Sequence, residues 1–189
     1  MTSSEAMGPF FVDRQRRKGT LTTLTRTTIR DLRPADWPDV ARIFEEGIRT
    51  GNTTFETESP TWAAWDAAHV AGHRLVVTLD DDVVGWAALS LVSSRSCYSG
   101  VAEHSIYIAE RARGLGFGRQ LLGALIASSE AGGFWTLEAG IFPENEASIA
   151  LHIARGFRVV GVRERLGCMD GVWRDVVLLE RRTAAETGA

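Results

Sequence analysis

The chain of 189 residues is long enough for one domain with its own core, and its hydrophobic (44%) and charged (24%) shares are ordinary for a globular protein. A net charge of −3 gives no general attraction to nucleic acid or to an anionic membrane. No apolar run approaches the roughly 20 residues needed to span a bilayer. These features argue against a membrane-spanning protein and against a nucleic-acid-binding protein.

The two cysteines, Cys97 and Cys168, lie far apart and outside any CxxC pattern. They indicate reduced thiols of a cytoplasmic protein, because a disulfide framework or a zinc site needs closer and more numerous cysteines. The histidines show no ligand spacing, so we expect no metal site. Residues 1–28 contain no apolar segment typical of a secretory signal.

Residues 1–27 differ in composition from the rest, with Ser and Thr clusters and a basic run at Arg14–Lys18. We interpret them as a flexible N-terminal extension, since no hydrophobic period runs through them. Four basic residues are weak evidence for an arm that binds nucleic acid. We expect one domain at residues 28–182 and a flexible C-terminal tail at residues 183–189.

The first half of the domain predicts a strand, two helices and a hairpin. A strand is expected at residues 27–32, followed by a helix that opens at Pro34 and Asp36 and runs to about Gly51. The segment 52–57 links it to a second helix, with Ser59 as N-cap, that ends near Gly72. Two β-rich runs, 74–79 and 83–91, flank an acidic turn and predict a hairpin.

The second half alternates strands and helices. We expect a strand at residues 102–109, a glycine-rich turn, a long helix to about Ala131, a strand at 134–141 and a short helix at 143–154. Two strands, 157–165 and 172–179, follow with a turn between them. Parallel strands that bracket helices, combined with antiparallel hairpins, predict an α/β domain with a mixed sheet.

The glycine-rich turn, residues 111–118, joins a strand to a helix whose apolar stripe begins at Leu121. Glycines there let backbone amides approach a phosphate, and the helix N-terminus adds positive partial charge. The turn is neither a Walker loop nor a Rossmann GxGxxG sequence. Taken alone, it fits a diphosphate site and a simple tight turn equally well.

A stripe of polar residues lies on the short helix predicted at residues 143–154. Asn145, Ser148 and His152 are spaced i, i+3 and i+7, so they share one helix face, and Gly156 ends the helix. Such a stripe alone would be interpreted as a solvent-facing surface. The short helix, however, follows the next strand after the glycine turn. This order predicts that the N-termini of the long helix and of the short helix face one cleft.

These two motifs together resemble the GCN5-related N-acetyltransferases (GNAT). Arg111-x-x-Gly114-x-Gly116 is similar to their acetyl-CoA pyrophosphate signature, and the stripe from Asn145 to Phe157 to their second CoA helix. The chain looks most like the phosphinothricin and methionine sulfoximine acetyltransferases, a resemblance that covers residues 29–181. The segments that carry it are Thr54-Phe55-Glu56-Thr57, Gly85-Trp86-Ala87, Arg95-x-x-Tyr98, Glu103-x-Ser105-Ile106-Tyr107-Ile108 and Gly171-x-Trp173-x-Asp175.

The resemblance implies a single-domain GNAT fold, a mixed central sheet flanked by helices on both faces, and acetyl-CoA as co-substrate. It implies Glu103 as general base, with Glu56 as the rival carboxylate, and His152 as a proton donor to the CoA thiolate or a CoA contact. An amide of Ile106–Ile108 would stabilise the oxyanion. The implied acetyl-CoA contacts are Ser105, Ile106, Tyr107, Ile108, Arg111, Arg113, Gly114, Leu115, Gly116, Phe117, Gly118, Arg119, Asn145, Ser148 and His152. The implied acceptor contacts are Phe55, Glu56, Trp86, Arg95, Tyr98 and Tyr107.

Arg95 would grip a carboxylate of a small amine acceptor, because a guanidinium binds carboxylates bidentately. Two other functions stay open: a protein N-terminal acetyltransferase with a peptide acceptor, and a non-catalytic module that senses acyl-CoA. We expect a homodimer, as in many relatives. We expect no nucleic-acid partner and no membrane partner.

Overall fold

The structure is a computed structural model that describes Phe10–Phe11 and residues 26–183. The strands are β1 (Phe10–Phe11), β2 (Arg26–Asp31), β3 (Arg74–Leu79), β4 (Asp82–Leu91), β5 (Val101–Ile108), β6 (Thr136–Ile141), β7 (Arg158–Met169) and β8 (Val172–Arg182). The helices are α1 (Trp37–Ile48), α2 (Trp62–Ala68), α3 (Phe117–Ala131) and α4 (Glu146–Ile153). Short 3₁₀ turns lie at Pro34–Asp36, Ser96–Tyr98 and Glu110–Ala112.

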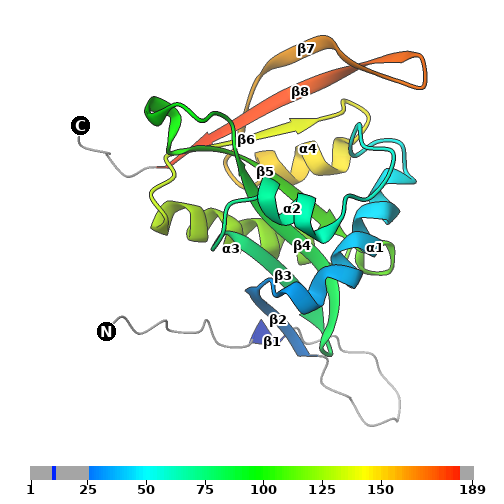
Figure 1. Cartoon of the computed structure of the whole chain (residues 1–189), viewed down its shortest axis with the longest axis vertical. Helices are drawn as coiled ribbons and strands as arrows, with labels where there is room; N and C mark the ends of the chain where they lie inside the picture. Colours follow the sequence, from blue (N-terminus) through cyan, green and yellow to red (C-terminus); the bar gives the residue numbers. More distant parts are fainter. Residues whose placement is uncertain (1–9, 12–25, 184–189) are drawn as a thin grey trace.

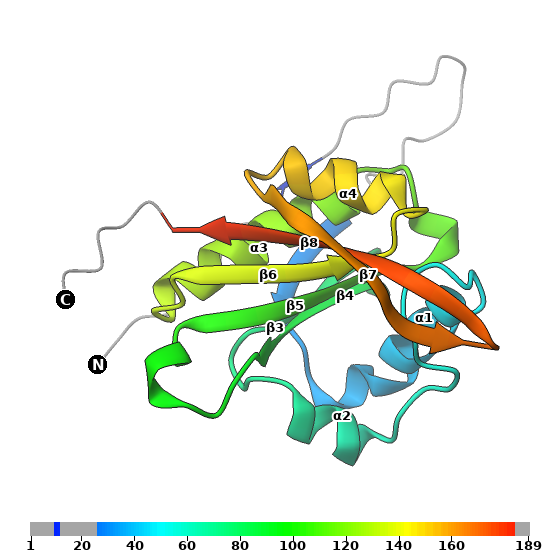
Figure 2. The ribbon, with the colours of Figure 1, turned by 90° about the horizontal axis from the view of Figure 1, so that it is seen from above.

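The described strands form one mixed sheet in the order β1-β2-β3-β4-β5-β6-β8-β7 (Figure 1). Neighbouring strands are antiparallel except β5 and β6, which run parallel and are connected through α3. Figure 2 shows α3 and α4 on one face of the sheet and α1 and α2 on the other. The predicted α/β class, with a mixed sheet between helices on both faces, is confirmed.

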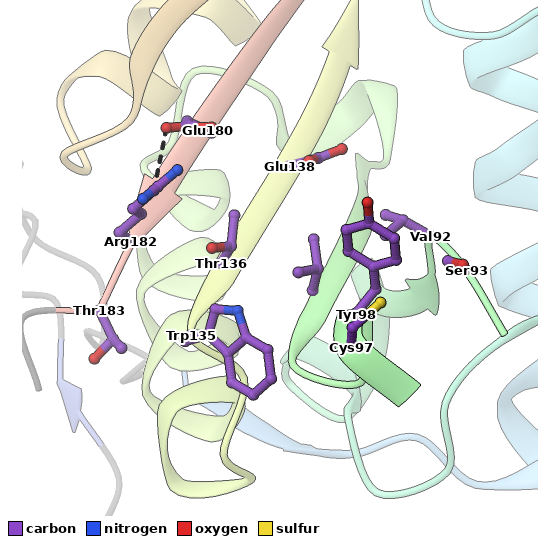
Figure 3. A pocket seen from close by; sticks show the side chains of 11 residues that line it. Val92, Ser93, Cys97, Tyr98, Trp135, Thr136, Glu138, Glu180, Arg182 and Thr183 are labelled. Carbon is purple, nitrogen blue, oxygen red and sulfur yellow. Dashed lines mark ion pairs between the residues drawn. The ribbon is translucent and has the colours of Figure 1, made fainter. Parts of the chain in front are cut away.

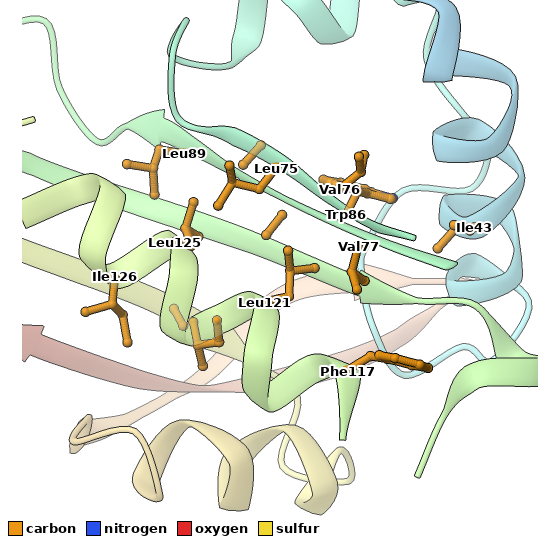
Figure 4. Packing of buried hydrophobic residues seen from close by; sticks show 14 of the residues in the cluster. Ile43, Leu75, Val76, Val77, Trp86, Leu89, Phe117, Leu121, Leu125 and Ile126 are labelled. Carbon is orange, nitrogen blue, oxygen red and sulfur yellow. The ribbon is translucent and has the colours of Figure 1, made fainter. Parts of the chain in front are cut away.

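The core lies on both sides of β3 and β4. Val76 and Trp86 face α1 and its Ile43, whereas Val77 faces α3 and its Leu121 (Figure 4). Because helices cover both faces of these strands, seven consecutive residues of β4 are buried. A strand covered on both faces gives a continuous hydrophobic run in the sequence rather than an alternating pattern.

The largest differences from the predicted element boundaries lie in the second helix, which ends at Ala68 rather than near Gly72, and in the C-terminal hairpin. The second helix begins at Trp62, and its N-cap is Thr61, whose hydroxyl accepts from the Ala64 amide at 3.3 Å, not Ser59. Packing of Trp62 against Trp37 accompanies this later start. The C-terminal hairpin is longer than predicted, because its turn is confined to Asp170 and Gly171, both with positive φ, as a two-residue hairpin turn requires.

Most of the predicted N-terminal extension and C-terminal tail lies outside the described residues. Within it, Phe10–Phe11 pair antiparallel with Arg26 and Thr27 at the edge of the sheet. None of the helices in residues 26–183 has the length and apolar character needed to cross a bilayer.

The feature that positions the site is the incomplete pairing of β5 with β6. The two strands pair only from Val101 to Glu103 on β5 and from Thr136 to Glu138 on β6. Beyond Glu103, β5 remains paired with β4 but has no partner on its other side among the described strands. The strands therefore part and leave an opening.

Candidate active site

A hollow of about 400 Å³, called here the inner hollow, fills the opening between β5 and β6. Among the predicted site residues, its lining includes Phe55, Glu56, Glu103, Ser105, Ile106, Tyr107, Asn145, Ser148 and His152. Residues that are far apart in the sequence therefore meet here, including the loop after α1 and the polar stripe of α4.

A second hollow of about 440 Å³ adjoins the first and is called the glycine-turn hollow. The predicted residues in its lining are Ile106, Tyr107, Ile108, Arg113, Gly114, Gly116, Phe117, Gly118, Asn145 and Ser148. Both hollows share Asn52, Thr53, Ile106, Tyr107, Asn145 and Ser148. They form one cleft that runs from the glycine turn to Glu103.

Glu103 stands at the last paired position of β5, opposite Glu138 of β6. Burial raises the pKa of its carboxyl group, and the charge of Glu138 raises it further, while the Gly140 amide and Arg163 act in the opposite direction. The carboxylate lies beside Gly140, with its Oε1 at an ordinary contact distance of 3.5 Å from the place that a Cβ of this residue would occupy. Glu103 is thus a carboxylate with a raised proton affinity at the end of the cleft.

The turn before α3 presents unpaired backbone donors to the glycine-turn hollow. Gly116 is the helix N-cap with φ 86°, and Gly114 has φ 73°, conformations that glycine adopts without strain. No side chain caps α3, so its first amides are free to bind an anion. This arrangement fits a diphosphate better than a turn that serves packing only, because a Cβ at Gly114 or Gly116 would meet no protein atom within 4 Å.

The predicted arginines of this turn have protein partners. Arg111 pairs with Asp82 at 3.2 Å, and Nε of Arg113 donates to the Ile108 carbonyl at 3.2 Å. Arg111, Leu115 and Arg119 do not line either hollow. The backbone of the turn, rather than a row of side chains, therefore faces the cleft.

The free edge of β5 also supplies backbone donors. The amide of Ala109 bonds the Val84 carbonyl at 2.9 Å, on the β4 side. Because hydrogen-bonding direction alternates along a strand, Ile106 and Ile108 direct their amides toward the open side. These two amides fall within the range predicted for oxyanion stabilisation.

His152 is buried (1% exposed), and both nitrogens of its imidazole have hydrogen-bond partners. Nδ1 lies 2.6 Å from the Ser148 carbonyl, and Nε2 lies 2.9 Å from Nε2 of His104, which is itself 6% exposed. A carbonyl only accepts, so Nδ1 of His152 carries the proton and its Nε2 must accept from Nε2–H of His104. Burial lowers the pKa of both histidines, that of His104 to about 3, so both rings are neutral.

This geometry does not favour the prediction of His152 as a proton donor. Its one proton is held by a backbone carbonyl, and its other nitrogen already accepts a hydrogen bond. The ring instead connects α4 to β5. No pattern in the sequence indicates that His104 and His152, which are 48 residues apart, are partners.

Trp86 does not reach the cleft, contrary to its predicted place in the pocket wall. It is 1% exposed and stacks on Tyr107 at 4.8 Å, so it supports that residue from behind. Tyr107 lines both hollows. Burial raises the pKa of its phenol to about 12, which keeps it protonated at physiological pH.

The rim of the inner hollow is built from three segments. Phe55 packs edge-on against Phe142 at 4.8 Å and against Gly167, where a Cβ would approach its ring to 2.6 Å. Arg174 of β8 joins these segments, donating to the Gly51 carbonyl and the Asn52 side chain, both at 3.0 Å, and lying 4.3 Å from the Phe142 ring. Arg174 is not among the predicted site residues, although the motif Gly171-x-Trp173-x-Asp175 contains both of its neighbours.

Arg95 and Tyr98 lie beside the inner hollow rather than in it. The Arg95 guanidinium is 5.6 Å from the centre of the Tyr98 ring. Tyr98 and Trp135 border a side pocket of about 550 Å³, which Figure 3 shows with Glu138 extending from β6. This side pocket and the inner hollow share Glu138.

No group of three or more His, Cys, Asp or Glu side chains in the described part of the chain could hold a metal ion. Cys97 and Cys168 are free and exposed. The cytoplasmic location inferred from the cysteines stays a prediction.

The chain matches the acetyltransferase (GNAT) family over residues 28–157. It is 36% identical over 184 residues to the phosphinothricin N-acetyltransferase of Alcaligenes faecalis, covering 94% of this chain and 93% of the relative. It is 34% identical over 161 residues to the L-methionine sulfoximine/L-methionine sulfone acetyltransferase of Pseudomonas paraeruginosa, covering 81% and 92%. A crystal structure of the phosphinothricin acetyltransferase (Pat) of Sinorhizobium meliloti in complex with AcCoA superimposes with a TM-score of 0.75 at 32% identity, covering 82% of this chain and 88% of the other.

Proposed function

The chain belongs to the acetyltransferase (GNAT) family, and from this we propose that it transfers the acetyl group of acetyl-CoA to the primary amine of a small amino-acid-like acceptor. The strongest support is the cleft that begins at the free amides of the glycine turn and ends at Glu103. The first end suits the diphosphate of CoA, and the second suits an amine that must lose a proton.

In the proposed reaction the neutral amine attacks the thioester carbonyl, a C–N bond forms, the C–S bond breaks and the thiolate leaves. Glu103 accepts the proton that the amine nitrogen loses. The amides of Ile106 and Ile108 on the free edge of β5 stabilise the oxyanion. His152, bound to Ser148 and His104, fixes α4 and its Asn145 beside the donor.

A thiol-release assay with acetyl-CoA tests the acceptor class. Methionine sulfoximine, methionine sulfone, phosphinothricin, other free amino acids and short peptides would be compared at equal concentration. We expect turnover with free amino acids or their analogues. Turnover on peptides alone would indicate a protein N-terminal acetyltransferase, and CoA binding without turnover on any amine would indicate an acyl-CoA-sensing module.

Replacing Glu138 with glutamine should move the acid limb of the kcat/KM pH profile to lower pH. Burial and then the charge of Glu138 raise the pKa of Glu103, so removing that charge lets Glu103 ionise at lower pH. Glu180→Gln is the matched control, because Glu180 is the register partner of Glu138 on β8 but does not line the inner hollow. An unmoved limb in Glu138→Gln would contradict this account of Glu103.

We also propose a homodimer formed through the β7–β8 hairpin. Its large exposed hydrophobic residues are Val159, Val160, Val162, Leu166, Val172 and Trp173. Among the described strands β7 pairs only with β8, so it is a sheet edge, and an apolar edge of this kind is typical of an interaction surface.

Replacing Trp173 with glutamate should weaken the dimer about thirtyfold, the effect of losing about 2 kcal/mol at an interface hot spot. Light scattering coupled to size-exclusion chromatography would measure the shift toward monomer. Leu91→Glu is the control, since Leu91 is similarly exposed (55% against 59% for Trp173) but lies on β4. Equal association of both variants and wild type would rule out this interface.

A further inference from the structure

Arg163 of β7 lines the inner hollow, together with Leu166. The register of β7 against β8 is irregular between Arg163 and Gly167. Within this irregularity Arg165 has φ 50° and its amide is held by the Asp175 carboxylate at 2.8 Å. An irregularity of this kind re-aims the side chains beside it, and here it accompanies an arginine at the end of the cleft.

The side chain of Arg163, an exposed residue of β7, makes no hydrogen bond or ion pair within the described residues, although its charge acts on the Glu103 carboxyl group. Four other arginines of β7 and β8 form ion pairs, among them Arg174 with Glu144 at 3.1 Å and Arg181 with Glu130 at 2.6 Å, whereas the Arg165 side chain, like that of Arg163, forms none among the described residues. A free guanidinium that lines a hollow is available to an anionic ligand, which it binds bidentately when the anion is a carboxylate.

Arg163 and Glu103 face the same hollow from different strands, and the arginine is close enough for its charge to act on the Glu103 carboxyl group. An α-amino acid carries an amine and a carboxylate on one carbon atom. We propose that Arg163 binds the carboxylate of an α-amino-acid acceptor while Glu103 receives its amine. This inference rests on the proposed acetyl transfer and specifies the acceptor that the site selects.

Arg95, the residue predicted from the sequence for this role, is less well placed. Its guanidinium lies over the Tyr98 ring, and it lines neither the inner hollow nor the side pocket. The side pocket meets the inner hollow only at Glu138. Assigning the carboxylate to Arg163 and assigning it to Arg95 therefore predict opposite effects of mutation, which one experiment can distinguish.

The experiment compares acetylation of methionine sulfone with acetylation of its α-carboxamide, which keeps the amine and loses the carboxylate charge. In Arg163→Met we expect kcat/KM for the acid to fall about 10- to 100-fold, the effect of losing hydrogen bonds to a charged group. The value for the carboxamide and the KM for acetyl-CoA should stay near wild type. Arg163→Lys should restore part of the preference for the acid.

Arg95→Met is the matched control and should keep the preference for the acid. Loss of that preference in Arg95→Met but not in Arg163→Met would overturn the inference and restore the role predicted for Arg95. Equal losses of kcat/KM for the acid and for the carboxamide in Arg163→Met would also overturn it, because they would show that the arginine does not bind the carboxylate. If the wild-type protein acetylates only peptides, the proposed acceptor class fails as well.

Discussion

Replacing Glu103 with glutamine should lower kcat/KM for acetyl transfer by about 10²- to 10⁴-fold at neutral pH, the usual contribution of a general base. Glutamine keeps the size of the side chain beside Gly140 and removes only its ability to accept a proton. Initial rates of thiol release with an active acceptor would measure the loss. The KM for acetyl-CoA should change little, because the glycine turn lies at the other end of the cleft.

The thermal stability of Glu103→Gln separates loss of chemistry from loss of fold. Burial raises the pKa of Glu103 in the folded protein, so the folded state binds its proton more tightly than the unfolded state. Such a group stabilises the fold when protonated, and this contribution is lost as the pH rises through the folded pKa. An uncharged glutamine should therefore leave the melting temperature at neutral pH equal to or above that of wild type.

Glu56→Gln is the comparison that tests the assignment of the base. Glu56 also lines the inner hollow, but it belongs to the loop after α1 and not to the strand that carries the free amides. We expect a much smaller loss in this variant. Near-normal turnover in Glu103→Gln together with a large loss in Glu56→Gln would exchange the roles of the two carboxylates.

Features that depend on local sequence could be predicted well. The order of strands and helices follows from hydrophobic periods bounded by glycine and proline. The glycine turn and the Asn145–Ser148–His152 stripe could be predicted because each lies within one short stretch of the sequence. The structure places both beside one cleft, since the chain from β5 through α3 to β6 and α4 brings the two helix starts together.

Features that depend on partners distant in the sequence could not be predicted. Trp86 lies in a motif that suggested a pocket wall, but it is buried because helices cover both faces of β4. The pairing of His104 with His152 needs the distance between β5 and α4, and it changes the chemistry that His152 can perform. Arg163 lies in a segment without any motif, and only the folded position of β7 shows that it lines the cleft.

Replacing Gly116 with alanine should raise the KM for acetyl-CoA about 10- to 100-fold while kcat at saturation changes little. Gly116 holds φ 86° at the N-cap of α3, a conformation that costs a residue with a Cβ about 1 to 2 kcal/mol. Relief of that strain would turn the first amides of α3 away from the diphosphate, where each hydrogen bond to a charged group contributes about 1.5 to 3 kcal/mol. If the diphosphate is held equally strongly in the ground state and in the transition state, losing that interaction raises KM and leaves kcat unchanged.

Gly133→Ala is a closely matched control at the other end of the same helix. Gly133 has φ 82°, and a Cβ at either glycine would meet no protein atom within 4 Å, so both variants carry similar backbone strain. We expect similar losses of thermal stability in the two variants and a raised KM only in Gly116→Ala. An equal KM in both would mean that the turn serves packing alone and that the donor diphosphate binds elsewhere. A raised KM in Gly116→Ala alone would assign the free amides of α3 to the donor, because strain common to both variants could not produce the difference.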